Sequence, residues 1–325
     1  MTVDSRGCLM DKLELLYSLG GGKSLLDPSS TRFNTFISAY NLSERVKIPF
    51  TNIISDNKFW LIHGEYHFTG EELPSDAECL SSDESSESDF VNEVMSKIPG
   101  GINAAGRVAI DITGFMRPHL MFLMAYLKNA GVLDFSLIYT EPSQYFNRAE
   151  TVFSSDVAEV RQVNGFEGTH DVDMSNDLLV VGVGYDHDLI NQVHQSKSGA
   201  RLLQLLSLPS LSPDMYQESL VRLSKLPDAP FEYADEQLAF ASANDPFHTC
   251  MVLYNAIARF ERMAGKSTNI YLSPLATKPQ AVGFALYYMK FLQPGSASIV
   301  VPITNAYTKE TSKGVGRTWV YDVHF

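Results

Sequence analysis

The chain has 325 residues, of which 45% are hydrophobic and 19% charged, and its formal net charge is −13. This length suits one large or two modest globular domains with room for a core. The composition excludes a disordered protein, a collagen-like fibre and a coiled-coil rod. No segment has the excess of Lys and Arg that a broad nucleic-acid surface requires, although a local cationic pocket is compatible with the sequence.

Cysteine usage and apolar runs predict the compartment. Cys8, Cys79 and Cys250 are odd in number and far apart, so we expect no disulfide framework and a reducing environment. The N-terminal residues lack the apolar core of a signal peptide. The most apolar run, residues 120–127, is too short to span a bilayer. We therefore expect a soluble cytoplasmic protein with no membrane partner.

Residues 1–105 predict a small α+β extension. Apolar side chains at helical spacing predict helices at residues 9–19 and 31–40. Residues 59–62 and 66–68 are typical of two strands that form a hairpin through residues 63–65.

An acidic, Ser-rich stretch follows, at about residues 71–90. It has no Lys or Arg, and it has too few apolar groups to offset the entropy cost of ordering it. We therefore predict a mobile loop over residues 74–88.

From residue 106 onward, short β-branched runs alternate with longer helical stretches. We predict strands at residues 108–112, 135–139, 177–181, 201–205, 238–241, 269–272, 298–302 and 318–325, and helices at 118–130, 188–196, 213–223, 246–263 and 279–292. Such alternation implies crossover connections and a mostly parallel sheet with helices on both faces. The prediction for residues 106–325 is thus a Rossmann-like α/β domain.

Two segments of this region resemble each other. Residues 110–127 and 270–289 each contain a strand, a turn of small residues, a basic residue, a proline and an apolar helix. The proline falls where the first turn of a helix tolerates it. Either a structural repeat or coincidence explains the similarity.

The carboxyl ends of the predicted strands carry small and polar residues, and open parallel sheets bind ligands at that edge. The basic residues Arg117 and Lys278 come just before predicted helices, whose N-termini favour anions. The candidate ligand-binding residues are Asp111, Thr113, Gly114, Arg117, Gly182, Gly184, Ser273, Thr277 and Lys278. They would hold a nucleotide or another phosphorylated ligand if Arg117 and Lys278 converge on one edge. In the alternative interpretation the Thr and Gly residues make tight turns and both cations are solvated.

Two carboxylates at strand ends are candidates for general acid/base catalysis, Glu141 and Asp186. In the alternative, Glu141 is a turn residue that pairs with an arginine such as Arg148, and Asp186 caps the next helix. Gly182 and Gly184 match the first two glycines of a dinucleotide fingerprint, but His187 occupies the third position. We predict no cofactor.

The histidines form no recognised zinc motif in the sequence. His63 and His67 are four residues apart, but they lack other residues typical of a zinc site nearby in the chain. We therefore predict no metal site.

The segment from Ser273 to Lys278, between a strand and a helix, resembles the glycine-threonine-lysine turn of CRISPR-associated Rossmann-fold sensor domains. The run Asp111-Ile112-Thr113-Gly114 is similar to the strand-end Thr-Gly pattern of the same domains. The resemblance implies a sensor of cyclic oligonucleotides that binds them across a dimer crevice, in prokaryotic antiviral defence. It also implies that Thr113, Gly114, Thr277 and Lys278 contact the ligand.

Three functional hypotheses remain open at this point. The first is a regulatory sensor that binds a nucleotide-like anion and acts with a partner protein or as a homo-oligomer. The second is a nucleotide-processing hydrolase or transferase that uses Glu141 or Asp186. The third is an interaction protein without a small ligand, whose acidic loop contacts a basic partner.

Overall fold

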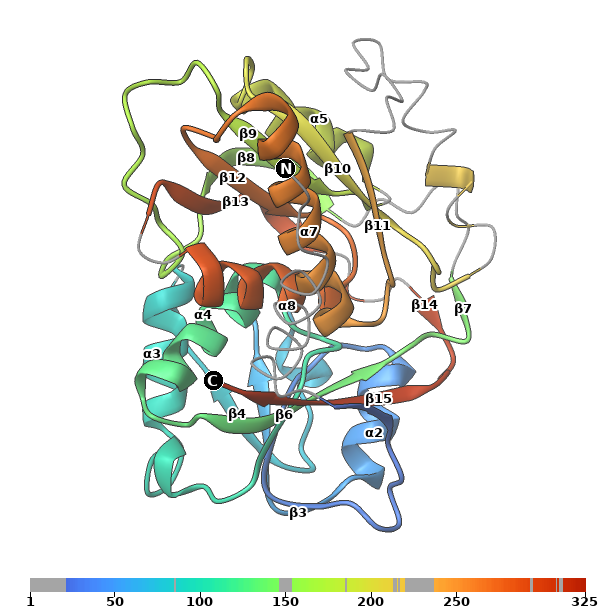
Figure 1. Cartoon of the computed structure of the whole chain (residues 1–325). Coiled ribbons are helices and arrows are strands. Elements are labelled where there is room, and N and C mark those ends of the chain that lie inside the picture. The colour runs from blue at the N-terminus through green and yellow to red at the C-terminus, as the bar shows by residue number, and fades with distance from the viewer. Residues whose placement is uncertain are drawn as a thin grey trace.

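The computed structural model describes residues 22–84, 86–145, 154–184, 186–212, 215, 217–219, 237–292, 295–307, 309 and 312–325. These residues form two mostly parallel sheets with helices, so the predicted Rossmann-like α/β class is confirmed (Figure 1). The helix predicted at residues 9–19, most of the one predicted at 213–223, and Arg148 lie outside the described residues.

The first sheet has seven strands in the order β1-β15-β6-β5-β2-β3-β4. The strands from β6 to β4 are parallel, whereas β15 pairs antiparallel with β6 and β1 antiparallel with β15. The bounds are β1 Lys23–Leu25, β2 Arg32–Ala39, β3 Ile54–Ile62, β4 Glu78–Ser81, β5 Val108–Asp111, β6 Asp134–Thr140 and β15 Thr318–His324.

The second sheet has six strands in the order β11-β10-β9-β12-β13-β8. All neighbours are parallel except β8, which pairs antiparallel with β13. The bounds are β8 Ser154–Gln162, β9 Leu178–Gly182, β10 Arg201–Ser207, β11 Leu238–Ala241, β12 Ile270–Pro274 and β13 Ala297–Tyr307.

The two sheets repeat one topology. Numbered along the chain, the parallel strands β2 to β6 and β9 to β13 both have the spatial order 3-2-1-4-5 of a Rossmann fold. The similar segments at residues 110–127 and 270–289 occupy the same place in each half, strand 4 and the helix after it. Their similarity therefore corresponds to a structural repeat.

Each half contributes its last strand to the sheet of the other half. After β6 the chain crosses and adds β8 to the second sheet, and after β13 it crosses back and adds β15 to the first. The two crossing segments pair with each other through β7 (Gln144–Tyr145) and β14 (Ser312–Lys313). This exchange joins the halves by backbone hydrogen bonds at three places.

The helices are named α2 Glu44–Asn52, α3 Glu87–Ser96, α4 Arg117–Asn129, α5 His187–Ser196, α7 Pro246–Ala264 and α8 Lys278–Tyr287, with short 3-10 turns at Gly64–Tyr66, Gly70–Glu72 and Ile102–Ala104 and a π segment at Tyr288–Leu292. A proline in the first turn begins α4, α7 and α8, at a position where its missing N–H costs nothing.

Helices α3, α4, α7 and α8 form a layer between the two sheets, and α4 packs on α8 (Figure 1). The largest buried cluster includes residues of this layer and of both sheets. Strand β9 shows why the chain forms these layers: Leu178 and Val180 point into this shared core, while Leu179 and Val181 point to a second cluster under α5. The two sheets therefore share one core.

The helix predicted at residues 31–40 is wrong, because these residues form β2 in the middle of the first sheet. Phe33, Phe36 and Ile37 have the spacing of a helical face. In a parallel strand covered on both faces, however, nearly every side chain is buried, and the alternation typical of strands disappears.

The predicted hairpin is also wrong. Strand β3 continues into the 3-10 turn at Gly64–Tyr66, and its strand neighbours are β2 and β4, both parallel.

The acidic stretch predicted as a loop contains β4 and the start of α3. Leu80 is fully buried there, and the Ser86 side chain accepts the N-cap hydrogen bond from the Asp89 backbone N–H. The predicted division between residues 105 and 106 separates β2 from β5, which are hydrogen-bonded neighbours in one sheet.

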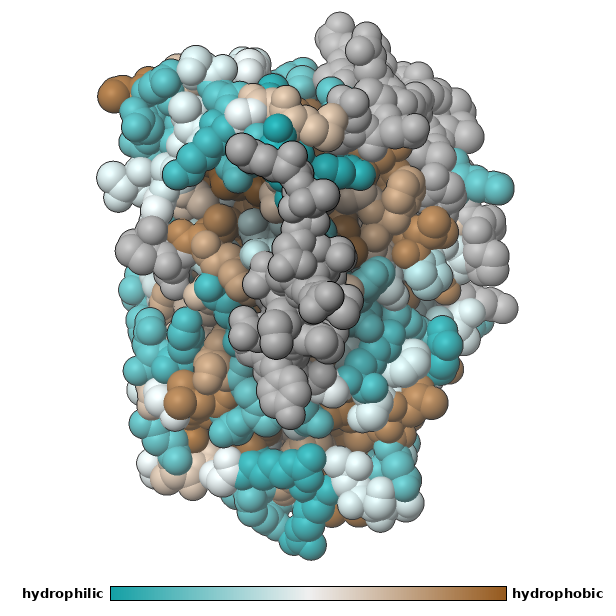
Figure 2. Space-filling view, viewed as in Figure 1, coloured by the Kyte–Doolittle hydropathy of each residue, from teal (hydrophilic) through white to brown (hydrophobic). Residues whose placement is uncertain are grey.

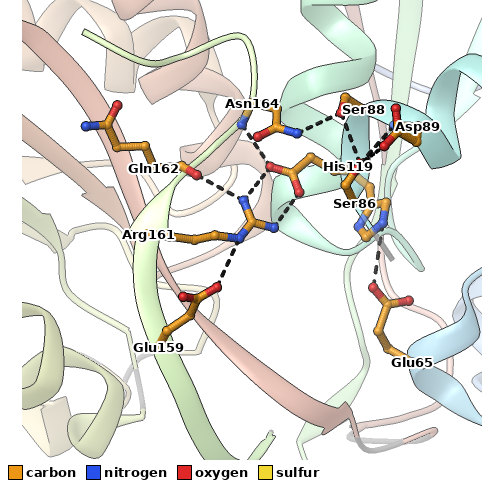
Figure 3. A network of polar contacts seen from close by, with 10 residues as sticks. Glu65, Ser86, Ser88, Asp89, His119, Glu159, Arg161, Gln162 and Asn164 are labelled. Carbon is orange, nitrogen blue, oxygen red and sulfur yellow. Dashed lines mark hydrogen bonds and ion pairs between the residues drawn. The ribbon is translucent and has the colours of Figure 1, made fainter. Parts of the chain in front are cut away.

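An ion pair connects the acidic stretch to the second sheet. Glu87 is buried, and both of its carboxylate oxygens accept hydrogen bonds from Arg161 on β8, at 2.9 and 2.6 Å (Figure 3 shows Arg161). The Asn164 backbone N–H adds a third bond at 2.8 Å. Burial alone would raise the pKa of Glu87, but the bonds from Arg161 and Asn164 hold it below its ordinary value.

Within the described ranges, no helix has the length and apolar character needed to cross a membrane. The molecular face in Figure 2 mixes hydrophilic residues with smaller groups of hydrophobic ones.

We expect Glu87→Gln to lower the free energy of unfolding at pH 7 by about 2 to 3 kcal/mol, because it leaves Arg161 without its buried counter-charge. A lowered folded-state pKa stabilises the protein above the unfolded-state pKa, and this stabilisation is lost as pH falls through the folded-state pKa. The difference between wild type and variant should therefore shrink in acid. Urea titrations followed by circular dichroism measure it. The matched control is Glu159→Gln, which removes the exposed carboxylate 3.6 Å from the same arginine and should change stability little.

Candidate functional site

A cleft lies where the carboxyl ends of strands from both halves meet. It encloses about 1350 Å³ including its open mouth. In a 3-2-1-4-5 sheet the crevice that binds ligands lies between strands 1 and 4. The cleft takes residues from all four such strand ends: those after β2 and β5 in the first half, and those after β9 and β12 in the second.

The cleft brings together several residues that the sequence predicted as site residues. Arg117, Gly184, Asp186, Thr277 and Lys278 line it. Arg117 at the start of α4 donates from Nε to the Ala276 carbonyl at 3.2 Å and from Nη2 to the Leu275 carbonyl at 3.3 Å. Arg117 therefore contacts the turn that leads to Lys278.

Cations dominate the charged residues of this lining. They are Arg45, Arg117, Lys278 and Lys309, with Asp186 as the carboxylate among the described lining residues. The chain as a whole has a net charge of −13, so the charge of the cleft lining is opposite in sign to that of the whole protein. Such a local reversal attracts anions.

Lys278 is the cation in the first turn of α8. No hydrogen bond or ion pair connects its ammonium to any residue in the described ranges, whereas Lys309 pairs with Glu72 at 2.7 Å. Burial, and then the charges of Arg45 and Arg117, lower the pKa of Lys278 well below its usual value. The carboxylate of Asp111 opposes this shift, but burial and the two nearby positive charges outweigh it.

Arg45 comes from the first turn of α2 and is 7% exposed. One guanidinium nitrogen donates to the Thr140 carbonyl at 3.3 Å, and its buried Nε has no partner among the described residues. Ser43, the N-cap of α2, also lines the cleft, and its hydroxyl makes no hydrogen bond to any described residue.

A buried carboxylate lies beneath these cations. Asp111 is fully buried and accepts hydrogen bonds from the Ser38 hydroxyl at 2.8 Å and the Thr113 backbone N–H at 2.9 Å. Burial raises the pKa of Asp111, while these bonds and the charge of Arg45 oppose the rise. Asp111 and Thr113 support the strand end and do not line the cleft.

Two glycines allow the backbone to approach closely at the two crevices. A Cβ on Gly114 would lie 1.9 Å from the Ala39 carbonyl oxygen, and one on Gly184 would lie 2.2 Å from the Leu275 oxygen. In each half, the glycine lies just after one of strands 1 and 4, and its backbone touches the backbone at the end of the other strand. Gly182 and Ser273 are buried at strand ends outside the lining, and the Ser273 hydroxyl has no described partner.

Glu141 lies outside the cleft lining, and its carboxylate is held by hydrogen bonds from three other side chains. Its carboxylate is 7% exposed and accepts hydrogen bonds from Arg317 at 3.0 Å, Trp319 at 2.8 Å and Asn244 at 2.5 Å. It therefore joins β6, β15 and the turn after β11. Asp186 lines the cleft and also caps α5 by accepting from the Leu189 N–H at 3.3 Å, as the alternative interpretation expected.

Sequence reasoning missed the contribution of the first half. Asn41, Ser43 and Arg45 follow β2, and the helix that the sequence pattern predicts at residues 31–40 has no strand end at which to expect them. Tyr66, Phe115 and Tyr139 add aromatic rings to the lining. Recognition of residues 32–39 as a buried strand would have pointed to the polar residues that follow it.

A scan against models of protein families and a search of curated proteins found no match to this chain.

We expect Gly184→Ala to destabilise the protein by about 1 to 3 kcal/mol, because the new methyl group overlaps the Leu275 carbonyl and forces the β12–α8 turn to move. Chemical denaturation measures the change. Gly70→Ala is the matched control, since a Cβ there meets nothing within 4 Å. Equal stability of the two variants would contradict the close approach at this crevice.

Proposed function

We propose that this protein binds a nucleotide-like or other phosphorylated ligand in the cleft between its two halves. The observation that supports this proposal is the position of three cations. Arg45, Arg117 and Lys278 each lie in the first turn of a helix, α2, α4 and α8, and all three line one cleft.

This arrangement is costly without an anion. The N-terminus of a helix carries a partial positive charge, so a cation there is unfavourable. Three such cations in one partly buried cleft also repel one another. A phosphate group would reverse both effects, because it accepts hydrogen bonds from free backbone N–H groups and from the cations.

The rest of the lining fits the remaining parts of a nucleotide. Tyr66, Phe115 and Tyr139 offer aromatic surface, and Asn41 and Ser207 offer neutral hydrogen-bonding groups. Ligand pockets combine apolar walls with a few polar groups in this way, and aromatic rings stack on bases. We therefore favour a nucleotide over a simple inorganic anion.

We further propose a regulatory role as a cytoplasmic sensor that acts with a partner protein or as a homo-oligomer, in prokaryotic antiviral defence. The support for this setting is the resemblance of the turns at Thr113 and Lys278 to CRISPR-associated Rossmann-fold sensor domains. Binding is favoured over catalysis because Glu141 is saturated with structural hydrogen bonds and Asp186 caps a helix.

Replacing Lys278 by Met tests the proposal in two directions. We expect Lys278→Met to weaken nucleotide binding at least about tenfold. The same variant should gain about 1 kcal/mol of stability without ligand, because it removes an unpaired, partly buried charge. Calorimetry and thermal shift against mono-, di- and cyclic nucleotides measure both quantities.

Lys266→Met, at an exposed lysine, is the control and should change neither quantity. If no nucleotide binds the wild type, the proposed ligand class is wrong. If Lys278→Met lowers both the stability of the free protein and its affinity for nucleotides, Lys278 is a structural residue.

Binding should also depend on pH through Lys278. The facing charged groups are Arg45 on α2, Arg117 on α4 and Asp111 on β5, and they leave the pKa of the free ammonium well below its usual value. An anion raises that pKa, so binding takes up a proton and the affinity falls as pH rises above the free-state pKa. Calorimetry at a series of pH values below the ordinary pKa of lysine, in buffers of different ionisation enthalpy, measures the proton uptake. Lys278→Met should abolish this proton uptake.

A further inference from the structure

Three metal-binding side chains meet beside the cleft, from two separate elements. His63 and Glu65 lie at the end of β3 and in the 3-10 turn after it, and His119 lies in the first turns of α4. One potential ligand atom from each residue lies within 4.8 Å of the other two. Figure 3 shows the Glu65 carboxylate directed at the His119 ring.

The distances suit a shared ion better than direct hydrogen bonds. His119 Nε2 lies 3.6 Å from Glu65 Oε1, which is too long for a hydrogen bond. Two ligand atoms on one tetrahedral zinc ion lie about 3.4 Å apart, given bonds of about 2.0 to 2.1 Å. The carboxylate and this imidazole are thus already at the spacing of two ligands, and a small movement of His63 completes the set.

Both histidines have an unused ring nitrogen in a buried setting. His63 is fully buried, His119 is 4% exposed, and Nδ1 of each ring makes no hydrogen bond to any residue that the structure describes. A metal bound at Nδ1 of His63 would give that buried nitrogen a partner. His119 faces Glu65 through Nε2, so Nε2 is its ligand atom. Burial lowers the pKa of both imidazoles, which leaves them in the neutral form that binds metals.

We propose that His63, Glu65 and His119 form a binding site for a divalent transition metal of the zinc class. Two imidazoles and one carboxylate are a donor set that zinc accepts, with the fourth position left to water. Glu65 is partly exposed, with 29% of its side chain accessible, so an ion can reach the site from solvent.

The bound ion would join the turn after β3 to the start of α4. The same two segments carry residues of the cleft: Tyr66 follows Glu65, and Met116 and Arg117 precede His119. In the metal-free chain the Met116 backbone N–H donates to His63 Nε2 at 3.4 Å. Coordination through His63 Nδ1 would place the ring proton on Nε2 and release this weak bond. The metal therefore holds one wall of the cleft, and this role is independent of which anion the cleft binds.

The test uses Co²⁺ and Zn²⁺ with the metal-free 325-residue chain. We expect one equivalent of Co²⁺ to give the visible absorption of a tetrahedral site, Zn²⁺ to displace it, and Zn²⁺ to raise the melting temperature. His63→Phe keeps the stacking of this ring on Phe90 but removes its nitrogens, and Glu65→Gln changes a partly exposed ligand. Each should weaken Co²⁺ binding on the order of 100-fold.

His67→Asn is the matched control, because His67 lies in the same turn, is exposed, and has a backbone φ of 48° that asparagine tolerates. It should bind Co²⁺ as the wild type does. The proposal fails if the wild type gives no tetrahedral spectrum, or if Glu65→Gln binds Co²⁺ unchanged. Failure of the metal proposal would not overturn the proposed nucleotide binding, because calorimetry with nucleotides measures that binding separately.

Discussion

The contact between Arg117 and the turn at Leu275 and Ala276 determines the geometry of the cleft. Helix α4 of one half packs against α8 of the other, and the guanidinium donates to two carbonyl oxygens at the start of α8. Both acceptors are backbone carbonyl oxygens of the other half, so the contact joins the two halves. The same interaction holds the guanidinium of Arg117 in the lining of the cleft.

The cations are a local conflict in an otherwise consistent fold. Proline in the first turn, buried strands and aspartate caps all agree with the observed elements. Arg45, Arg117 and Lys278 instead oppose the helix dipoles and repel one another. Proteins keep such conflicts where function requires them, and the surrounding structure compensates for their cost. Here Asp111, buried under Arg45 and Lys278, supplies part of that compensation.

The sequence predicted the second half of the fold better than the first for a physical reason. Strands such as β9 and β12 are short buried runs between longer helices, and the rule for carboxyl ends pointed to Lys278 after β12. Arg117 follows β5 in the other sheet, so the packing of the two halves, and not one sheet edge, brings the two cations into one cleft. Strand β2 is covered on both faces and shows no alternation, so Arg45 was missed with it. The group of His63 and His119 has no sequence signature, because only the fold brings these distant residues together.

The exchanged strands limit how the cleft can respond to a ligand. Strand β8 belongs to the first half by sequence but is hydrogen-bonded to the sheet of the second half. Strand β15 belongs to the second half by sequence but is hydrogen-bonded to the sheet of the first half. Separation of the halves would break both pairings and the shared core. In the proposed function, a bound anion would therefore act on the turns and helix starts that line the cleft rather than on the packing of the halves. Met116 lies at such a start, between Arg117 in the cleft and the ring of His63, so movement there reaches the histidine pair directly.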